Sequence, residues 1–176
     1  MRVLFFLSFI IFSCKPSYQK KIINNTPMYL DTFLIDVNKN IIKYEELEID
    51  SIISSSNIQF MKHPLGVRVH IMDTLNFQTP KIKPEDGSFV MIEYSCEILR
   101  HVRQLTYETS LVDTLNFKIG YSKQMKGLNY AIKLLRIGDK AKIIIPSYLG
   151  FGMSGYGKSV PPYSTLILNV KLLKIQ

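Results

Sequence analysis

Cysteine and histidine side chains are the first candidates for metal binding or nucleophilic chemistry, and this 176-residue chain holds two cysteines and three histidines. Cys14 and Cys96 lie far apart in the sequence. Neither stands at metal-ligand spacing from the histidines, which are His63, His70 and His101. Two cysteines are also too few for a framework of several disulfides. The sequence therefore predicts no metal site, and it offers no nucleophile and no cofactor-binding motif.

The charge of the chain is basic, with 22 Lys and Arg against 14 Asp and Glu and a net charge of +8. Such an excess attracts nucleic acid or an anionic membrane surface. The basic residues are scattered, however, and the richest short stretch is Gln19-Lys20-Lys21. A nucleic-acid-binding arm would carry a long Lys/Arg block. We therefore expect no nucleic-acid partner, and the 47% hydrophobic content predicts a globular domain with a core.

The N-terminus has the pattern of a secretory signal peptide. The mostly apolar run Val3–Phe12 follows Met1-Arg2 and carries no charge. As a helix rising about 1.5 Å per residue, it covers roughly half of a 30 Å hydrocarbon core. A charged start, a short apolar core and small residues are typical of export signals. The junction Ile11-Phe12-Ser13-Cys14 resembles a bacterial lipobox, although Phe12 is larger than the residue usual there. We predict a signal peptide over 1–13 and lipidation of Cys14.

Two other interpretations of this segment are an ordinary signal peptide and a buried helix in which Cys14 only packs. No A-x-A-type cleavage site follows the apolar run, and the chain turns polar directly after Cys14. Lys15 stands where some inner-membrane lipoproteins carry Asp. The expected location is therefore the outer membrane, with the protein anchored by lipid and facing the periplasm.

The rest of the chain predicts an α+β domain behind a tether and an N-terminal extension. Residues 14–43, with Pro16 and Pro27, indicate a tether with one short strand around 32–37. Residues 44–80 indicate a helix over 44–55 and a hairpin from 58 to 72. The predicted strands of the C-terminal part are 89–99, 116–120, 141–145 and 165–175. A helix over 124–135 and a structured loop over 146–162 complete the predicted elements.

Residues 81–176 also contain a characteristic series of short segments. In order, these are Val90-Met91-Ile92-Glu93-Tyr94, Tyr107-Glu108-Thr109-Ser110, Phe117-Lys118-Ile119-Gly120, Gln124-Met125-Lys126-Gly127-Leu128, Arg136-Ile137-Gly138-Asp139-Lys140-Ala141, Ile145-Pro146-Ser147-Tyr148-Leu149-Gly150-Phe151-Gly152 and Val160-Pro161-Pro162-Tyr163-Ser164-Thr165-Leu166. This series resembles the FKBP-type peptidyl-prolyl cis-trans isomerase domain. The lipobox and the N-terminal helix also resemble the FKBP lipoproteins of Bacteroidetes, including those associated with gliding motility.

The resemblance implies a half-wrapped antiparallel sheet around one short helix, with a shallow pocket between them. The catalytic positions it implies are Tyr94, Tyr107, Glu108, Met125 and Phe151. The substrate-binding positions it implies are Leu115, Gln124, Leu128, Val160 and Leu168. Met125 would supply a backbone N–H to a substrate carbonyl, and Leu128 would form the floor, where many members carry Trp.

Several positions depart from the family pattern. Phe151 stands where members usually have a Tyr whose hydroxyl binds the substrate carbonyl, and Glu108 replaces Asp. Leu115, Leu128 and Leu168 replace aromatic rings, whereas Tyr107 stands at a position that is usually Phe. Taken singly, the leucines and Met125 are ordinary core residues. We expect a weakened isomerase.

The sequence thus supports two functions. The first is a lipid-anchored peptidyl-prolyl isomerase that acts on proline-containing polypeptides and assists the folding of exported proteins. The second is a catalytically weak or inactive chaperone or binding module of the same fold in an envelope or gliding-motility complex.

Overall fold

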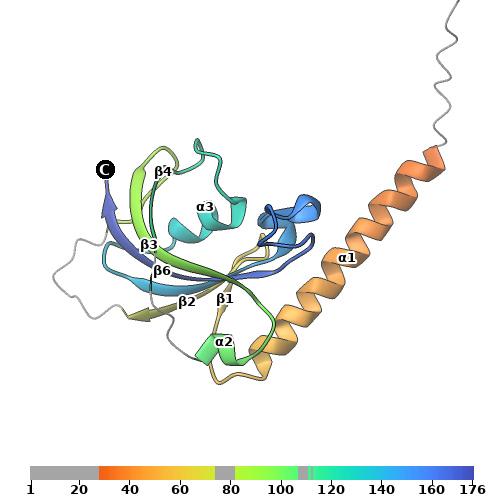
Figure 1. Cartoon of the computed structure of the whole chain (residues 1–176), viewed down its shortest axis with the longest axis horizontal. Coiled ribbons are helices and arrows are strands. Elements are labelled where there is room, and N and C mark those ends of the chain that lie inside the picture. Colours follow the sequence, from red (N-terminus) through yellow and green to blue (C-terminus); the bar gives the residue numbers. More distant parts are fainter. Residues whose placement is uncertain (1–27, 74–81, 107–110, 112) are drawn as a thin grey trace, which may run out of the picture.

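The computed structural model describes residues 28–73, 82–106, 111 and 113–176. Within these ranges the chain forms a six-stranded antiparallel sheet of order β1-β2-β5-β6-β3-β4 (Figure 1). The strands are β1 Met61–Lys62, β2 Arg68–Asp73, β3 Phe89–Ile98, β4 Asp113–Lys118, β5 Lys140–Ile145 and β6 Leu166–Ile175. The helices are α1 Met28–Ser54, α2 Arg103–Thr106 and α3 Lys126–Ile132, with short 3-10 helices η1 Ser147–Leu149 and η2 Gly152–Ser154. The predicted α+β class is confirmed.

The two central strands are buried on both faces, which explains their unbroken apolar runs. Ile143 and Ile145 of β5 belong to the main core, whereas Ile144 between them belongs to a second core on the other face. β6 follows the same alternation, because Leu166 and Leu168 lie in the main core and Ile167 in the second. Successive side chains of a strand point to opposite faces, so a strand covered on both sides carries apolar residues at consecutive positions. Two polar exceptions, Lys142 of β5 and Asn169 of β6, are buried and hydrogen-bonded to each other.

Helix α3 covers the main core at very short range. A Cβ atom placed on Gly127 would lie 2.4 Å from Cγ2 of Ile145, closer than two carbon atoms can approach. Glycine therefore lets α3 lie against β5, and the next residue, Leu128, is 1% exposed. This close contact fixes the position of the chain just before α3, where Met125 is the N-cap residue.

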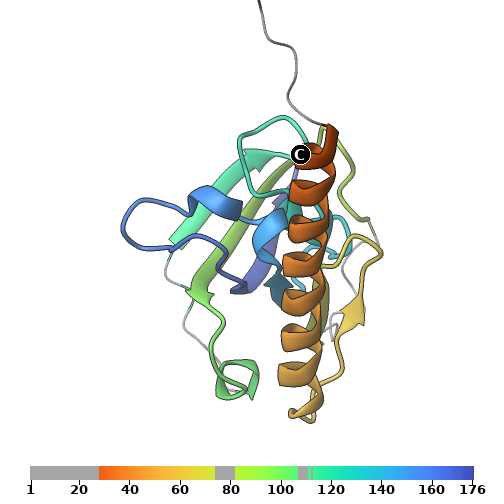
Figure 2. The ribbon, with the colours of Figure 1, turned by 90° about the vertical axis from the view of Figure 1, so that its right-hand side faces the viewer.

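The second core is closed by the C-terminal half of α1 together with α2. Its buried members are Ile49, Leu99, Leu105, Ile144 and Ile167. The N-terminal half of α1 instead extends away from the sheet (Figures 1 and 2) and exposes apolar side chains such as Phe33, Leu34 and Ile35. None of the helices in the described residues is both long and apolar enough to cross a bilayer.

The prediction for residues 28–43 was wrong. Helix α1 begins at Met28, so this part of the predicted tether is helical. Residues 32–37, where we expected a short strand, belong to the same helix. The segment has no glycine or proline, and extending a helix that is already docked costs little compared with starting one. Most of its described apolar side chains are exposed, among them Phe33, Leu34 and Ile35, so they form no buried face that would impose a helical pattern on the sequence. The remainder of the tether, 14–27, lies outside the described residues.

The hairpin between residues 58 and 72 is confirmed as the antiparallel pair β1–β2. It is not an appendage, however, because β2 also pairs with β5 over Arg68–Asp73. The predicted extension 44–80 therefore contributes strands to the same sheet as the C-terminal part. The strands predicted at 89–99, 141–145 and 165–175 are confirmed to within one residue at each end.

Candidate functional site

The predicted site residues come from separate parts of the fold, and most of those that the structure describes pack on one core. Five of them are half-buried and pack against the main core: Tyr94 (β3), Leu115 (β4), Met125 (before α3), Phe151 and Val160 (both between β5 and β6). The sheet register places β3 between β4 and β6 and pairs Tyr94 with both Asp113 and Val170. The tertiary structure therefore brings together residues that lie up to 66 positions apart in the sequence, from Tyr94 to Val160.

The other five predicted site residues have different outcomes. Leu128 and Leu168 are 1% and 0% exposed, so they support the site from below and offer no surface to a substrate. Gln124, the residue before Met125, lines a separate hollow with Tyr121, Tyr130 and Lys133. Tyr107 and Glu108 lie outside the described residues.

Met125 holds the backbone geometry that the predicted role requires. It is the N-cap of α3, with φ −53° and ψ 134°, and its carbonyl accepts hydrogen bonds from the Asn129 N–H and Nδ2, both at 3.1 Å. No residue in the described ranges accepts a hydrogen bond from the Met125 N–H. An N-cap N–H precedes the helical ladder, so this donor stays available to a ligand.

The segment 146–165, which we call the site loop, carries Phe151 and Val160. The Phe151 ring stacks on Tyr156, with centroids 4.9 Å apart and an interplanar angle of 25°. Tyr156 and Val160 exchange two backbone hydrogen bonds of 2.8 and 3.1 Å. This turn requires Gly155, which has φ +61° and whose added Cβ would lie 2.2 Å from the Val160 carbonyl oxygen. Tyr156 thus belongs to the site, although sequence reasoning missed it. The flanking Gly155 and Gly157 were the available signal.

Tyr94 is the half-buried phenol of this cluster. Burial raises the pKa of its hydroxyl, and the Asp113 carboxylate, Cys96 and Tyr156 act in the same direction. The hydroxyl therefore stays protonated at neutral pH and can donate a hydrogen bond. Phe151 has no such group, so phenols at this site come from Tyr94 and Tyr156 among the described residues.

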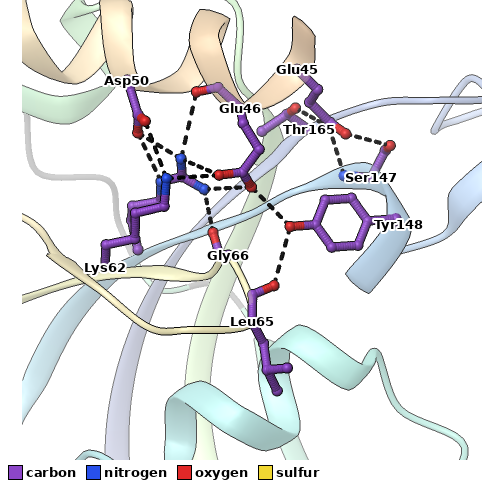
Figure 3. A network of polar contacts seen from close by, with 10 residues as sticks. Glu45, Glu46, Asp50, Lys62, Leu65, Gly66, Ser147, Tyr148 and Thr165 are labelled. Carbon is purple, nitrogen blue, oxygen red and sulfur yellow. Dashed lines mark hydrogen bonds and ion pairs between the residues drawn. The ribbon is translucent and has the colours of Figure 1, made fainter. Parts of the chain in front are cut away.

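A polar network beside the site attaches α1 to the sheet (Figure 3). The Arg68 guanidinium, 1% exposed, donates from Nη2 to Glu46 Oε2 at 2.8 Å and to Asp50 Oδ1 at 2.6 Å, and from Nη1 to the Gly66 carbonyl. Lys62 Nζ lies 2.9 Å from Glu46 Oε2. Burial alone would raise the pKa of Glu46, but hydrogen bonds from Arg68, Lys62 and Tyr148 lower it to about 2. Glu46 is therefore ionised throughout the physiological range.

The network reaches the site loop through Tyr148. Its hydroxyl donates to Glu46 Oε1 at 2.8 Å and lies 3.1 Å from the Leu65 carbonyl oxygen. Burial, together with the Glu46 carboxylate, raises the pKa of Tyr148. Gly66 is required here, because an added Cβ would lie 2.0 Å from that hydroxyl. Sequence reasoning missed this network, since none of its members forms a local motif.

The arrangement can bind an apolar group and orient a carbonyl, but the described side chains are not placed for bond cleavage. Tyr94, Leu115, Met125, Phe151 and Val160 offer apolar surface, and the Met125 N–H and the tyrosine hydroxyls offer neutral donors. The described ranges contain no group of three or more His, Cys, Asp or Glu side chains that could hold a metal ion.

The sequence is similar to a family of known proteins. Residues 80–173 match the model of the family described as FKBP-type peptidyl-prolyl cis-trans isomerase. The FK506-binding protein 1 of Kluyveromyces lactis is 31% identical over 119 residues, which cover 68% of this chain and 93% of that protein. The peptidyl-prolyl cis-trans isomerase FKBP53 of Arabidopsis thaliana is 27% identical over 124 residues. These cover 69% of this chain but only 25% of FKBP53, so the chain spans about a quarter of that relative.

A solved structure shares the fold. The crystal structure of FkpA from Escherichia coli matches with a TM-score of 0.56 at 17% sequence identity, covering 84% of this chain and 70% of that one. The coverage extends well beyond the 94 residues of the family match, which run from 80 to 173.

Proposed function

Because the chain belongs to the family of FKBP-type peptidyl-prolyl cis-trans isomerases, we propose that it is a lipid-anchored isomerase that assists the folding of exported proteins. Its substrates are proline-containing polypeptides. The observation that supports this proposal best is the packing of Tyr94, Met125 and Phe151, from three separate parts of the chain, on one apolar core beside the available Met125 N–H.

The reaction needs no covalent catalysis. An X–Pro amide must cross a barrier of about 18–20 kcal/mol, because rotation destroys the C–N resonance. The twisted amide is less polar than the planar one, and its carbonyl points in a new direction. An apolar surface that holds the prolyl ring, with a donor at the displaced oxygen, therefore binds the twisted state more tightly and lowers the barrier. Here the Met125 N–H is that donor, and Tyr94, Phe151 and Val160 contact the ring.

Phe151→Tyr should raise kcat/KM for an X–Pro peptide about two- to tenfold. The new hydroxyl would donate to the carbonyl of the twisted amide, and a neutral hydrogen bond is worth about 0.5–1.5 kcal/mol net, where about 1.4 kcal/mol is tenfold in rate. The measurement is a protease-coupled isomerase assay on the full chain. Phe60→Tyr is the matched control, because Phe60 packs on the second core and gains the same hydroxyl. A Phe151→Tyr protein no more active than this control contradicts the assignment of Phe151.

A binding module without turnover is the second candidate function, and the missing hydroxyl of Phe151 favours it. Such a protein would serve as a chaperone, or within an envelope or gliding-motility complex. It would bind proline-containing peptides with measurable affinity while the wild-type isomerisation rate stayed at the uncatalysed background. Catalysis by the wild type above that background excludes this candidate.

The lipid anchor rests on the sequence of residues 1–14, which lie outside the described residues. Cys14→Ala should release the protein from membranes and abolish metabolic labelling with palmitate, since stable anchoring requires more than one acyl chain on the modified cysteine. Fractionation and labelling in a bacterial host measure both effects, and Cys96→Ala is the matched control. Unchanged labelling of the Cys14 variant contradicts the anchor. The periplasmic face of the outer membrane is the proposed location, and separation of the two membranes tests it.

A further inference from the structure

We propose that Glu45 of α1 is a positioning residue for the isomerase site, because its carboxylate ties together the two ends of the site loop. The proposal rests on the proposed function for its effect on catalysis, whereas the tie itself is a property of the fold. It makes α1 part of the functional unit, although the helix lies outside the segment that matches the family model.

The tie consists of three short hydrogen bonds (Figure 3). Glu45 Oε1 accepts from the Ser147 backbone N–H at 2.6 Å and from the Thr165 hydroxyl at 2.5 Å. Glu45 Oε2 accepts from the Ser147 hydroxyl at 2.8 Å. Ser147 is 3% exposed. Hydrogen bonds to a carboxylate are roughly twice as strong as neutral ones, and those here are shielded from water on the Ser147 side.

Their position along the chain gives these bonds their effect. The β5–β6 ladder ends at the pair Ile145–Leu166, so Ser147 and Thr165 lie just beyond the last strand pairing. Glu45 therefore links the segments that follow β5 and precede β6, where the hydrogen bonds of the sheet have ended. The tie holds the first residue of η1, and only Gly150 separates the end of η1 from Phe151.

Backbone hydrogen bonds within the loop connect its tied ends to Phe151. The Gly150 N–H donates to the carbonyls of Pro146 and Ser147, at 3.1 and 3.0 Å, so η1 moves with Ser147 as a unit. The Tyr163 N–H donates to the Gly152 carbonyl at 2.9 Å and joins the Thr165 side of the loop to the residue after Phe151. Displacement of either tied end therefore displaces the Phe151 ring.

The rest of α1 does not replace this contact. Towards its N-terminus, α1 and the site loop face each other across a groove of about 550 Å³, lined by residues such as Leu34, Ile41 and Met153. Glu46, the next residue, binds Tyr148 of the loop but neither of its ends. Glu45 is thus the described α1 side chain that bonds both ends of the loop.

The test compares Glu45→Ala and Glu45→Gln with Asp50→Ala, using the full chain. Asp50 lies on the same helix, but its hydrogen bonds go to Arg68 and Lys62 and not to the loop, so its variant loosens α1 without cutting the tie. Amide hydrogen exchange of residues 147–165 is measured together with kcat and KM for an X–Pro peptide.

Glu45→Ala should accelerate exchange in the loop at least about tenfold relative to the β3 and β6 amides. It should also lower kcat/KM about three- to tenfold. The loss should fall mostly on kcat, because the displaced Phe151 ring contributes to binding the twisted amide more than the planar one. Glu45→Gln keeps one acceptor and should recover part of both effects, and Asp50→Ala should change neither. If Glu45→Ala does not fold, Thr165→Val removes one bond at nearly constant shape and should accelerate exchange to a smaller extent.

Loop exchange in Glu45→Ala no faster than in Asp50→Ala overturns the tie. Accelerated exchange with wild-type kcat and KM overturns the positioning role while leaving the tie. A wild-type protein that does not catalyse isomerisation refutes the proposed function instead, and the exchange result still decides whether Glu45 holds the loop.

Discussion

Arg68→Met should lower the free energy of unfolding by about 2–4 kcal/mol. Breaking a buried ion pair by removing one partner costs about 3–5 kcal/mol, and the loss here should be about 1 kcal/mol smaller because Lys62 stays beside both carboxylates. The Arg68 side chain is 1% exposed and joins β2 to Glu46 and Asp50 of α1, so the loss falls on the docking of the helix. Urea unfolding at neutral pH measures the effect.

Lys62→Met is the matched control for this prediction. Lys62 binds the same two carboxylates, but its side chain is 50% exposed, and exposed ion pairs contribute about 0–1 kcal/mol. Equal losses in the two variants would mean that burial of Arg68 does not stabilise the contact between α1 and the sheet. In that case α1 would be held by the apolar contacts of Ile49 and its neighbours in the second core.

Gly155→Ala should lower kcat/KM at least about tenfold while the sheet stays folded. Gly155 has φ +61° and ψ −159°, a region that is essentially restricted to glycine. The new Cβ would also lie 2.2 Å from the Val160 carbonyl oxygen and 2.9 Å from the Pro161 carbonyl carbon, which are backbone atoms that cannot rotate away. The turn must open, so Tyr156 and Val160 separate. A displacement of about 1 Å at a positioned group can cost a hundredfold in rate.

Gly157→Ala provides the control within the same turn. Gly157 has φ +54°, but nothing lies within 4 Å of its added Cβ, so the substitution costs only the left-handed backbone, about 1–2 kcal/mol. Its kcat/KM should stay within about threefold of the wild-type value. Circular dichroism and thermal unfolding of both variants establish that the sheet persists. Wild-type activity in a folded Gly155→Ala protein would place the substrate away from Tyr156 and Val160.

The hydrogen bonds from α1 and the turn at Gly155 act on the same loop. Glu45, through Ser147 and Thr165, and Glu46, through Tyr148, hold the loop against α1, and Gly155 shapes the turn that carries Tyr156. Substitutions at these positions therefore separate two causes of weak catalysis, a poorly placed loop and the absent hydroxyl of Phe151. Phe151→Tyr restores the donor without moving the loop, whereas Glu45→Ala moves the loop without touching a donor.

The sequence by itself determined the elements of the C-terminal part and the family. Local apolar runs bounded by turn residues predicted the strands at 89–99, 141–145 and 165–175. The order of the short segments from Val90 to Leu166 indicated the FKBP-type domain, which the family match confirms. The strand signals are local, because each depends on residues of one short segment, whereas the family signal depends on the order of these segments along the chain. The gathering of Tyr94, Met125 and Phe151 on one core was predicted through the resemblance alone.

Only the tertiary structure decided the role of α1 and the composition of the site's surroundings. The bonds from Glu45 to Ser147 and Thr165 join residues 102 and 120 positions apart, and no pattern in the sequence marks such partners. The same holds for Arg68, whose burial depends on two carboxylates from a helix that had been predicted in part as a tether. Hydrophobic periodicity reports burial against an unspecified partner, whereas a buried charge is stable only where the folded chain delivers its counter-charges. That placement is a property of the packed structure, which local sequence does not encode.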